Sequence, residues 1–299
     1  MEGQVRKHIK HSLWVCCILL FGWMLYSLVS HRLWQSDQKY EKSIKVLTLN
    51  THGMLIHESI TAKQKMLQYL NQQDADIICL QEVLVYKNPK RLTLPALREA
   101  MKKYPYTYYD FKIYNSHRQF GNVVFSRYPL INKQTIRYES KSNISSQCDV
   151  VVKGDTLRLI VNHLQSYGLV REDLQIDELT VEGLKNSSFN QKLQHADQLR
   201  HKQARAVKRA IRKAPHPVVV VGDFNAIPLS YVYWKIKFGL RDCFLESSFG
   251  KIGSTYRRKG IGVRIDYILC SRDLHPIKCR VDNSAKYSDH LPLISTIGW

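Results

Sequence analysis

The chain has 299 residues, a formal net charge of +20 and 44% apolar residues. This length accommodates one large domain or two small ones, and this composition excludes a chain that is disordered over long stretches. The positive charge indicates an anionic partner such as a phosphate-bearing substrate, nucleic acid or an acidic membrane, although a merely solubilising surface also explains it. The seven cysteines show no paired C-x-x-C spacing, so we predict neither a zinc site nor a dense disulfide framework.

The N-terminal part contains an uncharged apolar run, "SLWVCCILLFGWMLYSLVS", over residues 12–30. A run of this length is about enough to cross a bilayer, so we predict a transmembrane signal anchor there, with a basic flank over residues 1–11 and a polar linker over residues 31–43. A cleaved signal peptide is the alternative, but no A-x-A-like site follows the run. The preceding basic cluster favours a single-pass protein with an extracytoplasmic catalytic domain, whereas basic residues after the run weaken that orientation.

From residue 44 onwards, strands and helices alternate, which favours an α/β fold for residues 44–299. The apolar runs predict strands over residues 44–50, 75–83, 156–164, 217–222, 264–271 and 291–297, and a strand from residue 121 that runs into a turn at Pro129. The apolar spacing predicts helices over residues 61–73 and 94–104.

Residues 166–195 break this rhythm, because they are polar and read as an insertion or a lid-like loop with some helix. The next stretch, "HADQLRHKQARAVKRAIRKAP", predicts a helix that ends before Pro215. Its apolar stripe consists of Ala196, Leu199, Val207, Ala210 and Ile211. Its other faces carry Arg200, Lys202, Arg205, Lys208, Arg209, Arg212 and Lys213. These cations indicate either a solvated face or a contact with acidic headgroups or nucleic acid.

Polar groups recur where the apolar strands end or begin. They are Asn50, Glu82, His163, Asp223 and Asn225 after strands, and Asp266, Asp289 and His290 before strands. Each of them alone can be a turn or capping residue. Together they predict a site, because the strand ends of α/β sheets are where sites are built.

The chemistry of this set suits one reaction. Asn50 and Glu82 offer hard oxygen ligands for Mg²⁺, and the lack of a nearby thiolate disfavours zinc or copper. Histidines can donate to a phosphate, Asp223 can orient or deprotonate a water, and Asn225 can stabilise an equatorial oxygen. The pattern therefore predicts metal-assisted hydrolysis of a phosphoester.

Seven motifs carry a family resemblance over residues 44–299. They are, in order, "LTLNTHG", "ICLQEV", "GNVVFSRYPL", "VNHLQS", "GDFNAIP", "RIDYIL" and "SDHLPL". The chain thus resembles the endonuclease/exonuclease/phosphatase superfamily (DNase I-like), and looks closest to its membrane-anchored members from the Bacteroidetes. The resemblance implies a four-layer α/β sandwich in which two mixed β-sheets pack together between outer helices. It also implies Mg²⁺ as the cofactor, with Mn²⁺ as a substitute.

The resemblance assigns a role to each strand-end residue. It implies Glu82 as the principal Mg²⁺ ligand, with Asn50 beside it and Asp289 next to the metal. It implies that Asp223 positions or deprotonates the water and that Asn225 contacts the scissile phosphate. His163 matches the histidine that binds phosphate or assists the leaving group, and His290 matches a second active-site histidine held by Asp266. Because neighbouring side chains on an extended chain point in opposite directions, Asp289 and His290 are expected to have separate partners.

Two departures from the family pattern bear on the class. The "VNHLQS" stretch stands where the superfamily's AP endonucleases have a tyrosine motif, so His163 favours the DNase I, sphingomyelinase and phosphatase branches. Ala226 stands where many relatives have Asp, which alters nearby contacts more than the chemistry.

We therefore expect a membrane-anchored, Mg²⁺-dependent phosphoesterase that acts on a phosphodiester or phosphomonoester. Nucleic acid and phospholipid or headgroup substrates remain open, and no obligate protein partner is predicted. The alternative is a catalytically degenerate, membrane-tethered module that binds anionic ligands.

Overall fold

The computed structural model describes residues 39–54, 59–115, 117–140, 142–167, 188–248, 253–258, 261–285 and 287–299. Lys42–Trp299 forms one compact unit. The predicted anchor over residues 12–30 and its basic flank lie outside the described residues. Among the helices that are described, none is both long enough and apolar enough to span a bilayer.

Two six-stranded sheets form the centre of this unit. The first has the order β13-β14-β1-β2-β4-β3, and the second has the order β5-β6-β7-β8-β12-β9. The strands of the first sheet are β1 (Ser43–Asn50), β2 (Ile77–Tyr86), β3 (Tyr106–Asn115), β4 (Arg118–Ser126), β13 (His275–Val281) and β14 (Leu293–Gly298). Those of the second are β5 (Leu130–Ile136), β6 (Ile144–Val152), β7 (Asp155–His163), β8 (Val218–Asp223), β9 (Leu240–Asp242) and β12 (Asp266–Ser271).

Each sheet is mixed, as the sequence predicts, and contains one parallel pair. This pair is β1 with β2 in the first sheet and β7 with β8 in the second. The other pairings of both sheets are antiparallel. A separate hairpin joins β10 (Tyr256–Arg258) to β11 (Ile261–Val263).

Successive side chains of a central strand point to opposite faces of its sheet, so one set packs against the other sheet and the other set packs against the helices. On β8, Val219 and Val221 enter the core between the two sheets, while Val218 and Val220 enter a second core against the helices. This is the period of two that a strand buried on both faces requires.

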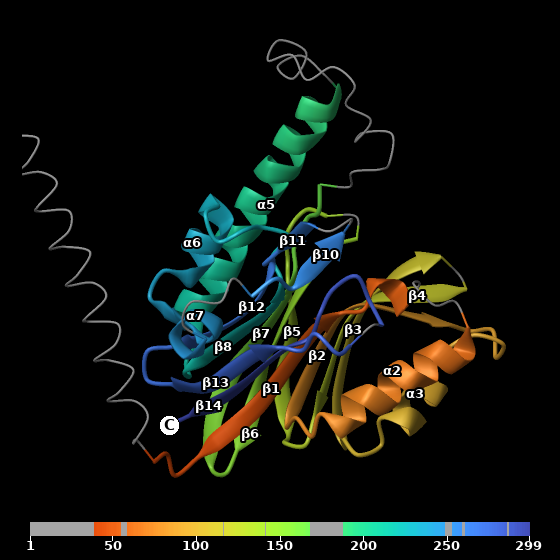
Figure 1. The fold of residues 1–299 in the computed structure, drawn as a ribbon, viewed down its shortest axis with the longest axis horizontal. Coiled ribbons are helices and arrows are strands. Elements are labelled where there is room, and N and C mark those ends of the chain that lie inside the picture. The colour runs from red at the N-terminus through yellow and green to blue at the C-terminus, as the bar shows by residue number, and fades with distance from the viewer. Residues whose placement is uncertain are drawn as a thin grey trace, which may run out of the picture. The chain divides into compact units, whose positions relative to one another are not determined.

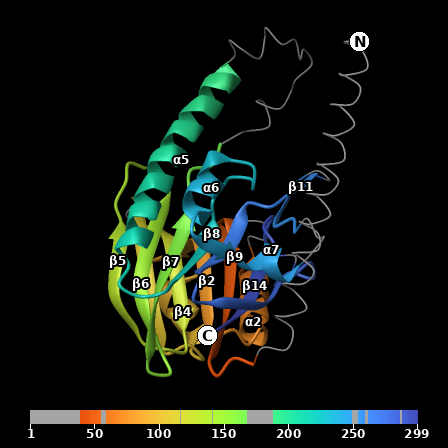
Figure 2. The same ribbon diagram turned by 90° about the vertical axis from the view of Figure 1, so that its left-hand side faces the viewer.

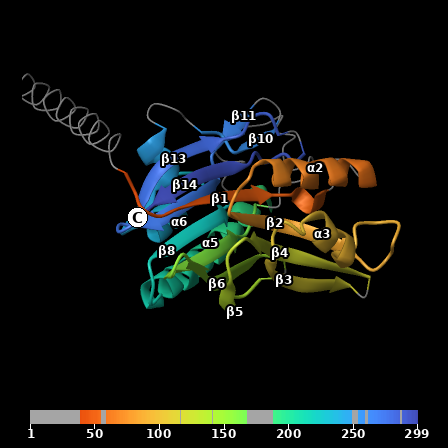
Figure 3. The ribbon, with the colours of Figure 1, turned by 90° about the horizontal axis from the view of Figure 1, so that it is seen from below.

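Helices cover both outer faces and complete the predicted four layers. A third core packs α2 (Ile60–Gln72) and α3 (Leu94–Ala100) on the first sheet. The helices α5 (Ser188–Lys213) and α6 (Tyr231–Lys237) pack on the second. Figure 1 and Figure 2 show these helix pairs on opposite sides of the sheets, and Figure 3 shows α2 and α3 beside β1, β2 and β4. The short α7 (Cys243–Ser247) and the 3-10 turn η1 (His52–Met54) complete the described helices.

The predicted strands and helices are present with shifted ends. The strand predicted from residue 121 into a turn at Pro129 is β4, which ends at Ser126, and β5 begins after this turn at Leu130. The predicted helix over residues 94–104 ends at Ala100. The sequence prediction missed β3, β6, β9 and β13 and the β10–β11 hairpin. The strands β3 and β13 alternate polar and apolar residues, β6 carries the polar residues Ser145–Gln147 near its start, and β9, β10 and β11 have three residues each.

The region after β7 differs from its prediction in two ways. Residues 168–187 of the predicted insertion lie outside the described residues, but α5 already begins at Ser188 rather than at residue 195. The prediction that Arg200 belongs to the exposed cationic face of this helix is wrong, because Arg200 is 1% exposed. Its guanidinium donates to the Gln165 carbonyl and to Asp197.

The topology explains why polar residues gather at one edge. The carboxyl ends of β1 and β2 point the same way, as do those of β7 and β8, because each pair is parallel. The antiparallel strands β12 and β14 begin where these neighbours end, so residues before them reach the same edge. Six chain segments thereby deliver side chains to one place.

Candidate active site

The site lies where the two sheets meet at this edge. Asn50 ends β1, His163 ends β7, Asp223 ends β8 and Asp266 begins β12. All four are at least 96% buried. Asp223 pairs in register with both His163 and Asp266, so the second sheet itself fixes the spacing of these three residues.

Glu82 reaches the site through a bulge in β2. The pairing of β2 with β4 shifts between Leu80 and Val83, and Glu82 has a φ of +55°. A bulge redirects a side chain, and a left-handed backbone at a residue other than glycine costs about 1–3 kcal/mol. Asn225 has the same feature with a φ of +48°. The fold thus holds two predicted site residues in strained conformations, which is common where side chains must converge.

Asn50 joins the acidic side chains of the two sheets. Its Nδ2 donates to Glu82 Oε1 at 2.9 Å and to Asp223 Oδ2 at 2.9 Å. Its Oδ1 accepts the backbone N–H of His52 at 2.9 Å. Burial raises the pKa of Glu82, but the neighbouring His163 and the hydrogen bond from Asn50 outweigh it and hold the pKa at about 2. Glu82 is therefore a carboxylate at neutral pH.

His163 lies against Glu82, with 3.1 Å between its Nε2 and Glu82 Oε1. Burial lowers the pKa of His163, but the negative charges of Glu82 and Asp223 outweigh burial and raise it. The buried Nδ1 of His163 has no hydrogen-bond partner within the described residues. The Nε2 side of the ring is therefore held by the Glu82 carboxylate, while Nδ1 makes no hydrogen bond within the described residues.

Asp223, His290 and Asp266 form a second cluster. His290 Nδ1 lies 2.9 Å from Asp266 Oδ2, and His290 Nε2 lies 3.8 Å from Asp223 Oδ2. Burial lowers the pKa of His290, but the two carboxylates raise it to about 10. Burial and the charge of Asp266 raise the pKa of Asp223. The predicted contact between Asp266 and His290 is thus present, and Asp266 fixes which imidazole nitrogen faces the cavity.

Asn225 is fixed against Asp223 and the end of β7. Its N–H donates to Asp223 Oδ1 at 2.7 Å, and its Nδ2 donates to the carbonyl of Leu164 at 2.9 Å. The next residue, Gln165, is clamped by α5. Its N–H donates to Gln203 Oε1 at 2.8 Å, and its carbonyl accepts from Arg200 Nη1 at 2.9 Å. The buried Arg200 therefore supports the segment that follows His163.

Asp289 and His290 have separate partners, as the sequence predicts. Asp289 Oδ1 lies 3.5 Å from His52 Nδ1, whereas His290 Nδ1 contacts Asp266. The chain before them is tied to β1, because Ser288 Oγ donates to the Asn50 carbonyl at 2.8 Å. Asp289 lies on the cavity but outside the two ligand groups described below, so its metal role stays a prediction.

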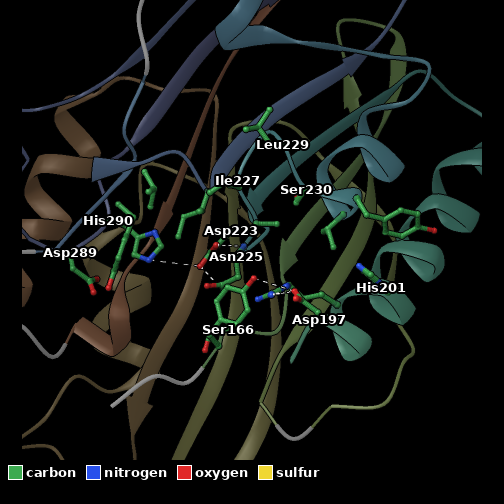
Figure 4. A pocket seen from close by; sticks show the side chains of 18 of the residues that line it. Ser166, Asp197, His201, Asp223, Asn225, Ile227, Leu229, Ser230, Asp289 and His290 are labelled. Atoms are coloured by element: carbon green, nitrogen blue, oxygen red, sulfur yellow. Dashed lines mark hydrogen bonds and ion pairs between the residues drawn. The ribbon is translucent and has the colours of Figure 1, made fainter. Parts of the chain in front are cut away.

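A cavity of 770 Å³ is lined by five residues of this site, Glu82, Asp223, Asn225, Asp289 and His290. Figure 4 shows Asp289 and His290 at one end, Asp223 and Asn225 in the middle, and Asp197 and His201 of α5 at the other end. This volume exceeds what a phosphate alone needs, so the part near α5 can accept the rest of a substrate.

Two groups of ligand atoms within the described residues lie close enough to share a metal ion, with all atoms of a group within 4.8 Å of one another. One is Glu82, His163 and Asp223, and the other is Asp223, Asp266 and His290. The donors are carboxylate oxygens and imidazole nitrogens, without a thiolate. Mg²⁺ and Mn²⁺ bind carboxylate oxygens and keep several water ligands, for which the cavity leaves space. The carboxylate of Glu82 is already ionised and can bind such an ion. The residues present therefore fit the divalent ion that the sequence predicts.

Sequence reasoning missed several supporting residues. His52, two residues after Asn50, faces Asp289, and its place in "LTLNTHG" offered a signal. Asn143 donates to the Leu164 carbonyl at 2.8 Å and lies 3.5 Å from His163 Nε2, but nothing in its sequence surroundings marks it. Thr255 accepts the N–H of Asp266 at 3.0 Å and likewise lacks a local signal.

Gly222 permits the close approach of β7 and β8 beside the site. It has a φ of +114°, and a Cβ there would lie 2.1 Å from the Asn162 carbonyl oxygen. Only glycine combines this conformation with this spacing. The residue that follows is Asp223, so the backbone freedom of Gly222 helps to place the carboxylate.

Two packed mixed sheets that converge on buried carboxylates, amides and imidazoles define an α/β sandwich protein with a polar site at one sheet edge. A sequence model of the Endonuclease/Exonuclease/phosphatase family matches residues 47–290. The chain therefore belongs to the endonuclease/exonuclease/phosphatase family, whose enzymes are metal-dependent phosphoesterases. No curated protein sequence matches the chain.

Solved structures share the fold at low sequence identity. An endonuclease/exonuclease/phosphatase from Beutenbergia cavernae DSM 12333 has a TM-score of 0.69 and 17% identity, covering 86% of this chain and 72% of that one. Truncated TDP2 from Caenorhabditis elegans has a TM-score of 0.61 and 16% identity, covering 88% and 100%. Sphingomyelinase C from Streptomyces griseocarneus has a TM-score of 0.58 and 17% identity, covering 85% and 99%. These likenesses establish the fold.

Proposed function

We propose that the chain hydrolyses a phosphoester through in-line attack of a water oriented by Asp223. The observation that carries this proposal is the position of Asp223, whose carboxylate contacts Asn50 and His290 from two distant segments and Asn225 two residues further along its own. A residue that only shapes a turn does not require contacts from distant segments of the chain. The raised pKa of Asp223 also suits a general base, because a base works best when its pKa lies near the working pH.

The neighbouring side chains complete the reaction. His290 holds a proton on Nε2, since Asp266 accepts from Nδ1 and the pKa of the ring is raised to about 10. It can therefore donate to a phosphoryl oxygen that gains charge in the transition state. We assign Asn225 to a second phosphoryl oxygen, and His163 to the phosphate or the leaving oxygen.

A divalent ion belongs to this mechanism. Glu82 is the proposed principal ligand, with Asn50 and Asp289 beside it, and Mg²⁺ is the proposed ion. Asn50 Nδ2 donates to Glu82 Oε1, so the amide of Asn50 has to rotate before its oxygen can bind the ion. When bound, such an ion polarises the phosphoryl group and neutralises its charge.

We further propose that the enzyme is anchored in a membrane through residues 12–30, with the catalytic domain extracytoplasmic. The support is the uncharged run in the sequence and the basic residues that precede it. Anchoring favours a phosphoester that is itself found at a membrane. The fold is shared with sphingomyelinase C, whose name identifies a lipid phosphodiesterase, and with TDP2.

The test measures turnover by the full-length chain in detergent with Mg²⁺, Mn²⁺ or EDTA. Substrates are a soluble bis-aryl phosphodiester, plasmid DNA, single-stranded oligonucleotide, phospholipid and inositol phosphates. We expect hydrolysis that EDTA abolishes and that Asp223→Asn and His290→Gln reduce by at least about 100-fold. Tight binding of anionic ligands without turnover of any substrate would instead identify a degenerate binding module.

A further inference from the structure

The helix α6 is apolar on two faces. Its inner face buries Val232, Tyr233 and Ile236. Its outer face carries Tyr231 and Trp234, followed by Phe238 at the helix end, which are 45%, 54% and 75% exposed. The spacing of three and seven residues places them in one row along the helix. Packing of the described core does not explain this outer row.

The row continues into the loop before α6. Leu229 is 86% exposed and Ile227 is 45% exposed, and both line the catalytic cavity. In Figure 4 these two side chains lie on the same side of the cavity, and Ile227 is nearer to Asp223 than Leu229 is. Five of the eleven exposed large apolar side chains among the described residues thus fall between residues 227 and 238. Such a concentration marks an interaction surface, and this one begins at the rim of the active site.

Each exposed ring of this row has a lysine beside it. The Nζ atoms of Lys237, Lys208 and Lys235 lie 5.2, 5.6 and 6.0 Å from the ring centroids of Trp234, Phe238 and Tyr231. Apolar rings flanked by long cationic side chains match the boundary between acyl chains and acidic headgroups. The formal net charge of +20 adds a general attraction to such a surface.

Single-stranded nucleic acid also binds rings and lysines, because bases stack on aromatic faces. However, the most exposed side chain of the row is Leu229, and Ile227 lies beside it. Aliphatic side chains offer no stacking face, whereas they insert readily among acyl chains. The composition of the surface therefore favours lipid.

We propose that Ile227, Leu229, Tyr231, Trp234 and Phe238, with Lys208, Lys235 and Lys237, form a surface that docks on an anionic lipid bilayer. We call these eight residues the α6 surface. Docking brings the mouth of the cavity onto the bilayer, so the substrate class is a phosphoester in a lipid headgroup. This substrate assignment rests on the proposed phosphoesterase function, whereas the docking itself does not.

The first experiment measures docking without catalysis. The full chain, labelled with 5-fluorotryptophan, is placed in nanodiscs of phosphatidylcholine with roughly one third phosphatidylglycerol. Loss of one ¹⁹F resonance in Trp234→Phe assigns that residue. Nitroxide-labelled lipid is expected to broaden the Trp234 resonance strongly and the Trp299 resonance little. Trp299 is the internal control, because it pairs with Lys42 at the end of β1 remote from Asn50.

The second experiment separates docking from chemistry. Trp234→Ser/Phe238→Ser removes two side chains of the row that do not line the cavity. Ile131→Ser/Ile277→Ser is the matched control, because these side chains are 47% and 48% exposed on β5 and β13. We expect the first variant to hydrolyse phospholipid in these nanodiscs about tenfold more slowly or worse, with unchanged turnover of a soluble phosphodiester. The control is expected to retain both activities.

Two results would overturn the proposal. One is a Trp234 resonance that nitroxide lipid broadens no more than that of Trp299. The other is a Trp234 resonance that responds to an oligothymidylate and not to the lipid, which would make the α6 surface a nucleic-acid platform. If no phosphoester is cleaved but Trp234 is broadened, the proposed function fails and the docking stands.

Discussion

Replacing Gly222 by Ala is expected to damage both stability and catalysis. The new Cβ would lie 2.1 Å from the Asn162 carbonyl oxygen and 2.9 Å from the Asn162 nitrogen, and both atoms belong to the backbone of β7. To restore ordinary contact, β7 and β8 must separate by about 1 Å, since packed interiors leave little slack. This movement falls between Val221 and Asp223.

The free energy of unfolding is expected to fall by about 3–5 kcal/mol. The positive φ of +114° accounts for about 1–3 kcal/mol of this loss, and the overpacking accounts for a similar share. Because Asp223 moves with its neighbour, turnover is expected to fall about 100-fold even in the folded fraction.

Gly154→Ala is the control, because Gly154 has a φ of +90° but a Cβ added there would meet no atom within 4 Å. This variant is expected to lose only about 1 kcal/mol of its free energy of unfolding and to retain activity. Urea unfolding followed by circular dichroism, together with kcat at a temperature where all variants are folded, measures both effects. Equal destabilisation by the two substitutions would refute the argument from strand spacing.

Three further outcomes are expected. Glu82→Gln should weaken Mn²⁺ binding at least about 100-fold in calorimetry, because the ionised carboxylate is lost; unchanged binding would remove Glu82 from the metal site. Asp266→Asn should lower kcat between about 10²- and 10⁴-fold with little change in KM, because His290 loses the carboxylate that orients its ring and keeps it protonated. An equal rise in KM would contradict this. Asp282→Asn should lower the free energy of unfolding by about 2 kcal/mol at pH 7. Burial raises the pKa of Asp282, but the hydrogen bonds from Ser284, Tyr69 and Arg280 outweigh burial and lower it to about 2. This depressed pKa stabilises the fold above pH 3.8, so the difference from wild type in urea unfolding should shrink as the pH falls from 3.8 towards 2; a pH-independent difference would contradict the assignment.

The sequence predicted the central strands and the members of the site for a physical reason. Buried strands such as β8 are continuous apolar runs, and a polar residue that directly follows one, such as Asp223, is conspicuous. The alternating strand β3 and the short β9 lack that contrast. The sequence identified Glu82 as a site residue but did not predict the bulge in β2 that carries it. No residue type indicates where the register between two strands shifts.

Supporting residues were the hardest to predict. The sequence pattern of α5 placed Arg200 among the solvated cations, since a charged residue on a helix is usually exposed. Its burial depends on the Gln165 carbonyl and on the ring of Tyr167, 3.9 Å from the guanidinium carbon. Both belong to a segment more than thirty residues earlier, so local periodicity cannot reveal them.

The pairing of β1 with β14 has a consequence for biosynthesis. Ser288 closes on the carbonyl of Asn50 across 238 residues of chain, and Ser43 pairs with Gly298. A ribosome must therefore synthesise the segment from Ser288 through β14 before His290 can be held against β1. A nascent or truncated chain that lacks this strand has no complete catalytic centre. The site is therefore completed only after β14 has left the ribosome.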